Sequence, residues 1–77
     1  MSNLERYENV FIKVFSFDKV SGNPKRGETP SWDSIGHMQL ISEIEDVFNI
    51  MLDTEDIIGI DTYENGKEIL KKYDIKI

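Results

Sequence analysis

Hydrophobic residues recur every three or four positions along two long segments, which is the spacing of one face of an α-helix. In residues 3–17 the apolar positions at this spacing are Leu4, Tyr7, Val10, Phe11, Val14 and Phe15. In residues 34–49 they are Met38, Leu40, Ile41, Ile44, Val47 and Phe48. Ser2 or Asn3 can cap the first helix and Asp33 the second, because short polar side chains accept hydrogen bonds from the first free backbone N–H groups.

A short third helix is predicted within residues 50–61. Asp53 or Thr54 can cap this helix, and Asp56 stands at the acidic position of a capping box. Its apolar positions, which we expect to be buried, are Ile57, Ile58 and Ile60. Gly59 is expected to end the helix, because glycine commonly follows the last helical turn.

The last helix is predicted from about Thr62 to Tyr73, with Asp61 and Glu64 at capping-box spacing. Its inward-facing positions are Tyr63, Ile69, Leu70 and Tyr73. Residues 18–32 contain two glycines and two prolines and show no helical period, so they form a long loop. The pattern therefore predicts an all-α fold, a four-helix bundle that forms one domain over residues 1–77, with a long first loop and a short third helix.

Composition narrows the class of protein. The chain has 77 residues, enough for one small domain, and it has no cysteine, which excludes disulfides, thiol catalysis by the chain itself and cysteine-ligated zinc. No apolar run approaches the ~20 residues of a membrane-spanning helix. The first ten residues lack the basic and apolar regions of a signal peptide. We therefore expect a cytoplasmic protein with no membrane span.

The charges are segregated along the chain. The net charge is -6, and no lysine or arginine occurs between Gly27 and Gly66, whereas ten of the fifteen acidic residues lie there. This segment would repel a phosphate backbone, so nucleic acid is a poor partner. A basic protein surface would be attracted to it. The same charges are also compatible with a solvated face that only confers solubility.

Two candidate chemistries are disfavoured by spacing. Residues 53–64 partly match a calcium-binding EF-hand loop, but Ile57 offers no oxygen at the fifth position and the glycine is displaced to Gly59. Ser34 and His37 lie close together on a predicted helix, but a hydrolase would also need a group that orients the imidazole and an oxyanion hole. His37 falls in the apolar sector of the helix, where we expect it to be partly buried. We therefore predict no metal site and no catalytic residue.

Ser34 is better suited to be a point of covalent attachment. It stands in the first turn of the second helix, directly after the loop, where its hydroxyl is expected to be exposed and rigidly held. A phosphodiester at this position would lie at the positive end of the helix dipole. Ile35 falls on the polar side of the same helix, so it is predicted to be an exposed apolar contact beside the attachment point.

The sequence Asp33-Ser34-Ile35 resembles the Asp-Ser-Leu signature of acyl carrier proteins and related peptidyl and aminoacyl carrier domains. The resemblance covers nearly the whole chain, because the helix order, the long first loop, the run LISEIEDVFNI and the opening IDTYENGKEIL of the last helix are also similar. The chain departs from the family pattern where Ser31 replaces a usual glycine and where Gly36 replaces a common acid. These departures suggest a stand-alone carrier of a specialised pathway.

The resemblance implies that Ser34 carries 4'-phosphopantetheine, transferred from coenzyme A by a phosphopantetheinyl transferase with magnesium. Acyl or aminoacyl cargo of lipid or polyketide biosynthesis would be held as a thioester on the thiol of that arm, and the protein would be a monomeric carrier rather than an enzyme. Acyl-loading and acyl-transferring enzymes with basic docking surfaces would contact it. The residues implied in docking are Asp33, Ile35, Met38, Glu43, Glu45 and Asp46. Two alternatives stay open, a peptidyl or aminoacyl carrier protein and an unmodified acidic helical adaptor.

Overall fold

The computed structural model describes all 77 residues, which form four helices and no strand. The helices are α1 (Asn3–Phe15), α2 (Ser34–Phe48), α3 (Thr54–Gly59) and α4 (Tyr63–Lys71). The predicted all-α class, the order of the helices, the long first loop and the short third helix are confirmed. The first helix ends two residues earlier than predicted, because Ser16 adopts the left-handed conformation with φ of 58°.

Three of the four helix N-termini are capped by a side chain, and the N-terminus of α3 is not. Ser2 caps α1, one of the two caps that the sequence offered, and it forms a reciprocal capping box with Glu5, in which each side chain accepts from the other's backbone N–H at 3.0–3.1 Å. The boxes predicted for the last two helices are wrong. Asp53 makes no side-chain capping bond at α3. At α4 the cap lies one residue later than expected, where Thr62 accepts a hydrogen bond from the backbone N–H of Asn65.

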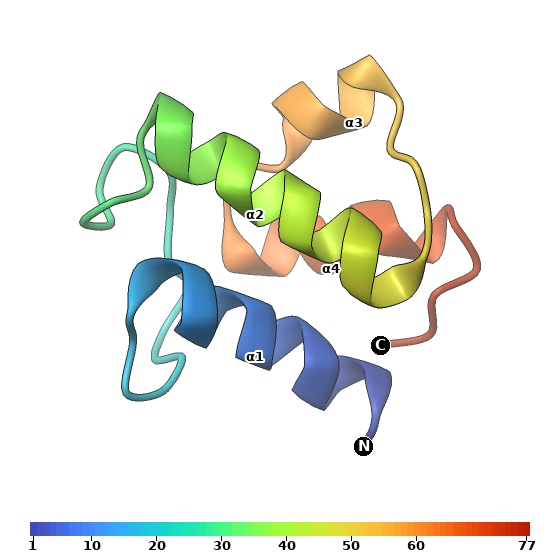
Figure 1. The fold of residues 1–77 in the computed structure, drawn as a ribbon, viewed down its shortest axis with the longest axis horizontal. Coiled ribbons are helices and arrows are strands. Elements are labelled where there is room, and N and C mark those ends of the chain that lie inside the picture. Colours follow the sequence, from blue (N-terminus) through green and yellow to red (C-terminus); the bar gives the residue numbers. More distant parts are fainter.

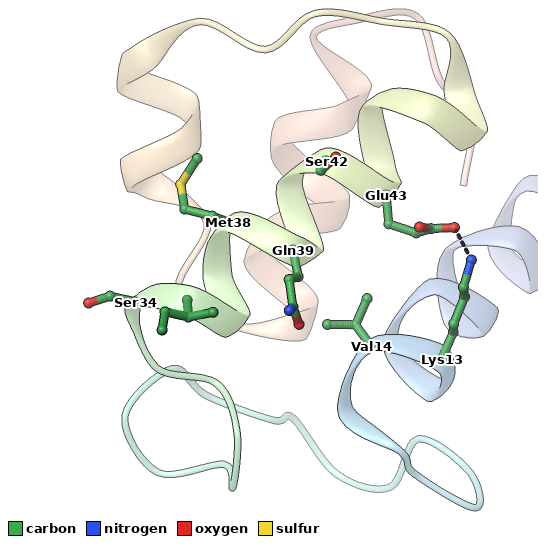
Figure 2. Close-up of a pocket in the computed structure, with 8 residues that line it drawn as sticks. Lys13, Val14, Ser34, Met38, Gln39, Ser42 and Glu43 are labelled. Carbon is green, nitrogen blue, oxygen red and sulfur yellow. Dashed lines mark hydrogen bonds and ion pairs between the residues drawn. The ribbon is translucent and has the colours of Figure 1, made fainter.

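Helices α1 and α2 run side by side, and the short α3 lies on the other side of α2 (Figure 1). The Lys13 ammonium of α1 and the Glu43 carboxylate of α2 form an ion pair at 2.9 Å across this contact (Figure 2). Both chain termini lie at the same end of the bundle in Figure 1. The long loop lies at the opposite end, where α1 finishes and α2 begins, so it can position the start of α2.

The long loop is tied to the start of α4 by backbone hydrogen bonds. The N–H of Arg26 donates to the carbonyl of Asp61 at 2.8 Å, and the N–H of Tyr63 donates to the carbonyl of Pro24 at 2.9 Å. These bonds form an isolated antiparallel bridge between residues 25 and 62. The loop is therefore anchored in the middle of its length, which shortens the segment that leads into α2.

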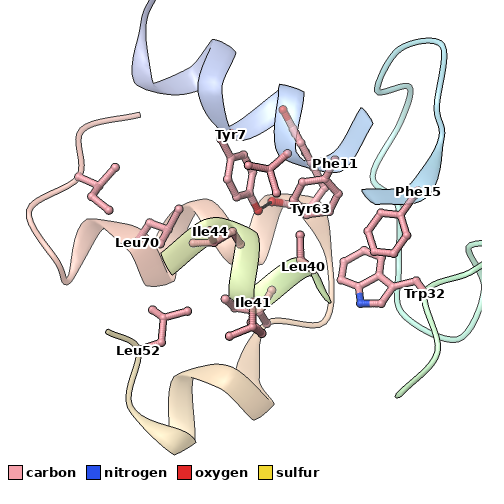
Figure 3. Close-up of a cluster of buried hydrophobic side chains, with 13 residues drawn as sticks. Tyr7, Phe11, Phe15, Trp32, Leu40, Ile41, Ile44, Leu52, Tyr63 and Leu70 are labelled. Atoms are coloured by element: carbon pink, nitrogen blue, oxygen red, sulfur yellow. Dashed lines mark hydrogen bonds between the residues drawn. The ribbon is translucent and has the colours of Figure 1, made fainter. Parts of the chain in front are cut away.

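The core is centred on aromatic rings (Figure 3). Phe11 contacts Tyr7 and Tyr63 with ring centroids 5.0 Å apart in each pair, and Trp32 at 5.4 Å. The hydroxyl of Tyr7 donates to the carbonyl of Tyr63 at 2.7 Å, so this buried polar group is satisfied. The buried hydrophobic residues are Tyr7, Val10, Phe11, Phe15, Trp32, Leu40, Ile41, Ile44, Leu52, Ile60, Tyr63, Leu70 and Ile75.

Four positions differ from the predicted burial. Leu4, Met38 and Ile58 were placed on apolar faces, but all three are exposed. Trp32 was placed in the loop, but its side chain is only 1% exposed and stacks on Phe15. A loop residue shows no periodicity, and in a six-residue helix two neighbouring isoleucines cannot both face one side, so the pattern could not assign Trp32 and Ile58. The exposure of Met38 agrees with the docking role that the resemblance implies for it.

Candidate functional site

The first turn of α2 is built by Asp33 and the residues that follow it. The side chain of Asp33 accepts a hydrogen bond from the backbone N–H of Gly36 at 2.9 Å, as the predicted N-cap requires. The carbonyl of Asp33 accepts from the N–H of His37 at 2.8 Å. Two bonds therefore hold the backbone on both sides of Ser34, which is the first residue of the helix.

The loop packs directly against this turn. A Cβ atom placed on Gly36 would lie 1.8 Å from the carbonyl oxygen of Ser31, so only glycine fits between the helix and the loop backbone. Ser31 itself has a φ of 71°, in the left-handed region. This contact gives a physical reason for a glycine at position 36, where the resembling family commonly has an acid.

Ser34 presents its hydroxyl to solvent. The residue is exposed, and none of the side-chain hydrogen bonds at the start of α2 involves its hydroxyl. Figure 2 shows the side chain pointing away from the bundle at the start of α2. The predicted exposure of this serine is therefore present in the structure, in a turn held by Asp33 and by the loop, and its oxygen is accessible from solvent.

Two open grooves meet at Ser34. The larger, of about 810 Å³, runs along α2 beside the end of α1 and is lined by Lys13, Val14, Ser34, Ile35, Met38, Gln39, Ser42 and Glu43 (Figure 2). The smaller, of about 490 Å³, lies between the loop, α2 and α3 and is lined by Arg26, Gly27, Trp32, Asp33, Ser34, His37, Met38, Ile57 and Ile58. Ser34 and Met38 line both grooves, so a group attached to the serine could lie along either.

Exposed apolar side chains surround the serine. Ile35 is 73% exposed, Met38 56% and Ile58 63%, and each lines one or both of the grooves at Ser34. The exposure of Ile35 confirms the sequence analysis. Ile58 adds a contribution from α3 that the sequence placed in the core. Exposed apolar residues gathered at one point are typical of a surface that contacts another molecule.

The three acids on α2 that were predicted to dock partners make different interactions. Glu43 is half-buried and paired with Lys13. The carboxylate of Glu45 accepts a hydrogen bond from the backbone N–H of Leu52 at 2.9 Å, so it holds the connection that follows α2. Asp46 is exposed and takes part in no ion pair within the chain. Asp46 is therefore the α2 carboxylate that is free to meet a partner's charge.

Asp56 is not a capping residue, contrary to the sequence prediction. Its carboxylate is buried and accepts hydrogen bonds from the Lys72 ammonium at 2.7 Å and from the Tyr73 hydroxyl. The hydrogen bond from Lys72 is the main cause that lowers the pKa of Asp56, with Tyr73 second. This group ties α3 to the end of α4. Because Asp56 is buried and paired, it does not contribute to the acidic surface.

The structure supports neither the calcium-binding loop nor the serine–histidine hydrolase that the sequence analysis disfavoured. Residues 54–59 form a helix, so the acids of the EF-hand-like segment do not wrap a common centre, and no group of three potential metal ligands occurs in the chain. His37 does not face the Ser34 hydroxyl, since one ring nitrogen accepts from the indole N–H of Trp32 and the other donates to the carbonyl of Ile57. A serine–histidine pair for hydrolysis is therefore not formed.

Three residues of this region were not identified from the sequence. Trp32, Arg26 and Ile58 line the smaller groove, and all three come from outside α2. A single tryptophan at the end of a loop, five residues before the only histidine, was the one available signal. The proximity of Arg26 depends on the folding of the loop onto α4, which no local pattern reports.

Comparisons with protein-family models, with curated proteins and with solved structures found no match. No helix in the structure combines the length and the apolar character needed to cross a membrane.

Proposed function

We propose that this protein is a carrier, which holds acyl or aminoacyl intermediates as thioesters on a 4'-phosphopantetheine arm attached to Ser34. The observation that carries the proposal is the exposed, unpaired Ser34 hydroxyl at the first position of a helix whose first turn is held by Asp33 and by the loop. When bound, the arm would supply the thiol that a chain without cysteine lacks.

The surroundings of Ser34 suit a phosphodiester. Its oxygen lies at the N-terminus of a 15-residue helix, where the helix dipole favours a negative charge by about 0.3–1 kcal/mol. In the loading reaction the Ser34 oxygen forms the new bond to phosphorus, its proton is lost, and the bond from that phosphorus to the rest of coenzyme A breaks. The two grooves beside Ser34 leave room for an attached chain on either side of Met38.

The docking surface proposed for partner enzymes combines an apolar centre with an acidic rim. Ile35 and Met38 form the centre, next to Ser34. Asp33 lies at one edge and Asp46 farther along α2, and Glu43 reaches this surface as a member of its pair with Lys13. Partners with basic surfaces would be steered by these charges, and the apolar residues would supply contact area.

The test is mass spectrometry of the expressed protein after incubation with coenzyme A, magnesium and a phosphopantetheinyl transferase of broad specificity. We expect a gain of one phosphopantetheinyl group. Ser34→Ala should abolish the gain. Ser42→Ala is the matched control, because Ser42 is also exposed on α2 and lines the same groove, and it should load normally. No gain in the wild type, or a gain that persists in Ser34→Ala, would refute the assignment.

An unmodified adaptor is the second candidate, and the exposed apolar side chains of Ile35, Met38 and Ile58 favour it as well, because an adaptor also needs a contact surface. The same experiment separates the two functions. An adaptor would show no mass gain and would bind its partner equally well after Ser34→Ala. Whether the cargo of a loaded carrier is acyl or aminoacyl is then read from the mass of the thioester.

A further inference from the structure

The chain's only histidine makes a hydrogen bond through each of its ring nitrogens. The Nδ1 atom of His37 lies 3.0 Å from the indole Nε1 of Trp32, and its Nε2 atom lies 2.6 Å from the carbonyl oxygen of Ile57. Trp32 belongs to the end of the long loop, His37 to the second turn of α2, and Ile57 to α3. One imidazole therefore joins three segments of the chain.

The two partners determine the tautomer. An indole N–H can only donate, so Nδ1 of His37 must accept with its lone pair. A carbonyl can only accept, so Nε2 must carry the hydrogen. The ring is thus neutral with its proton on Nε2. A second proton can enter only at Nδ1, where it would point at the N–H of Trp32, so protonation and this hydrogen bond exclude each other.

Each of the two bonds joins His37 to a different neighbouring segment. Trp32 is buried against Phe11 and Phe15, and its indole N–H has His37 as its partner. The six-residue α3 is too short to be stable by itself. Its C-terminal carbonyls accept from two side chains outside the helix, with His37 bonded to Ile57 and Arg26 bonded to the carbonyl of Ile58 at 3.4 Å.

We propose that His37 is a pH-sensitive latch. In its neutral form it joins the loop and α3 to the start of α2. Protonation at Nδ1 breaks the bond to Trp32 and loosens the end of the loop beside Ser34, whereas the bond from Nε2–H to Ile57 of α3 is retained. The latch would thereby change the smaller groove, to which Trp32, Ile57 and Ile58 all contribute. This inference does not depend on whether Ser34 is modified, because it concerns only the folded chain.

Burial, together with the charge of Arg26, favours the neutral form of His37. Arg26 from the loop and Asp33 from the start of α2 line the same groove, and α3 contributes only Ile57 and Ile58 there. The carboxylate of Asp33 is directed to the N–H of Gly36. Burial is the main cause that lowers the pKa of His37 below its ordinary value. The hydrogen bond to Ile57 opposes this shift, and the positive charge of Arg26 adds to it.

The direction of the pH effect follows from this shift. The imidazole of the unfolded chain takes up a proton below about pH 6.5, whereas the folded protein resists it. Stability is therefore retained above that pH and falls as the pH drops from about 6.5 toward the pKa of the folded protein. In this interval the unfolding equilibrium constant should rise by up to about tenfold per pH unit, the limit for one proton.

The first test is an NMR pH titration of the unmodified wild-type protein, which needs no variant. Above about pH 7, Nδ1 of His37 should resonate as an unprotonated nitrogen and Nε2 as a protonated one. On acidification the imidazole and the indole N–H of Trp32 should shift with one common midpoint below 6.5. The opposite tautomer, or a histidine that titrates while the indole N–H of Trp32 does not respond, would overturn the latch.

Two variants test the mechanism. His37→Gln keeps a donor and an acceptor but cannot be protonated, so its stability should lose the pH dependence between about pH 7 and pH 5. Trp32→Phe removes the opposing N–H, so the midpoint of His37 should move upward toward about 6.5. An unchanged midpoint in Trp32→Phe would contradict the inference. If His37→Gln does not fold, the wild-type titration still decides the question.

Discussion

Replacing Gly36 with alanine places a methyl group where the backbone of the long loop already lies. The new Cβ atom would be 1.8 Å from the carbonyl oxygen and 3.0 Å from the carbonyl carbon of Ser31, so the loop must move by roughly 1 Å or more. Overpacking of this kind costs about 1–3 kcal/mol, and a backbone obstacle belongs at the upper end of that range. The higher helix propensity of alanine offsets about 1 kcal/mol of this cost at most.

We therefore expect Gly36→Ala to lower the free energy of unfolding by about 2 kcal/mol, which in a domain of this size lowers the melting temperature by about 8–16 °C. Urea unfolding followed by the fluorescence of Trp32, the only tryptophan, measures the free energy of unfolding directly. The matched control is Gly59→Ala. Its Cβ would meet only the flexible end of Ile69 at 3.4 Å, so its stability should stay the same or rise by up to about 1 kcal/mol.

The predicted clash at Gly36 would be refuted if Gly36→Ala were as stable as the wild type, or if both alanine variants changed stability by the same amount. Either result would mean that the loop does not pack on the first turn of α2. The contact also bears on function. A loop displaced from Gly36 would no longer hold the turn that presents Ser34, so the variant should be loaded more slowly than Gly59→Ala by the same transferase.

Three further predictions concern other parts of the molecule. Tyr7→Phe should cost about 1–3 kcal/mol in urea unfolding, because the buried carbonyl of Tyr63 loses its donor; a change below about 0.5 kcal/mol would contradict this. Asp56→Asn should reduce stability at pH 7 and make stability less dependent on pH in acid, because the ionised carboxylate, whose pKa is lowered chiefly by Lys72, stabilises the fold above about pH 4 and this stabilisation is lost as the carboxylate is protonated at lower pH. Equal slopes of stability against pH in both proteins would exclude this role. Asp46→Lys should slow loading at low salt with little effect at high salt, and equal rates would make this acid a solubility device.

The helices and their order were determined by local chemistry. The two long helices each have a continuous apolar stripe, and two of the predicted caps, Ser2 and Asp33, make the expected bonds. The exposure of Ile35 followed from its angular position on a long helix. In each case the deciding interactions lie within a few residues of one another, so the sequence alone carried the information.

Only the tertiary structure decided what the remaining polar and aromatic residues do. Asp56 is bound by the end of α4, Glu45 by the backbone after α2, and Trp32 by α1 and His37. Ile58 is exposed because α3 is shorter than two turns and only one side of it packs against the core. Periodicity reports the faces of long helices, whereas these partners are brought together by folding of the loop and of α3, which leave no repeating pattern in the sequence.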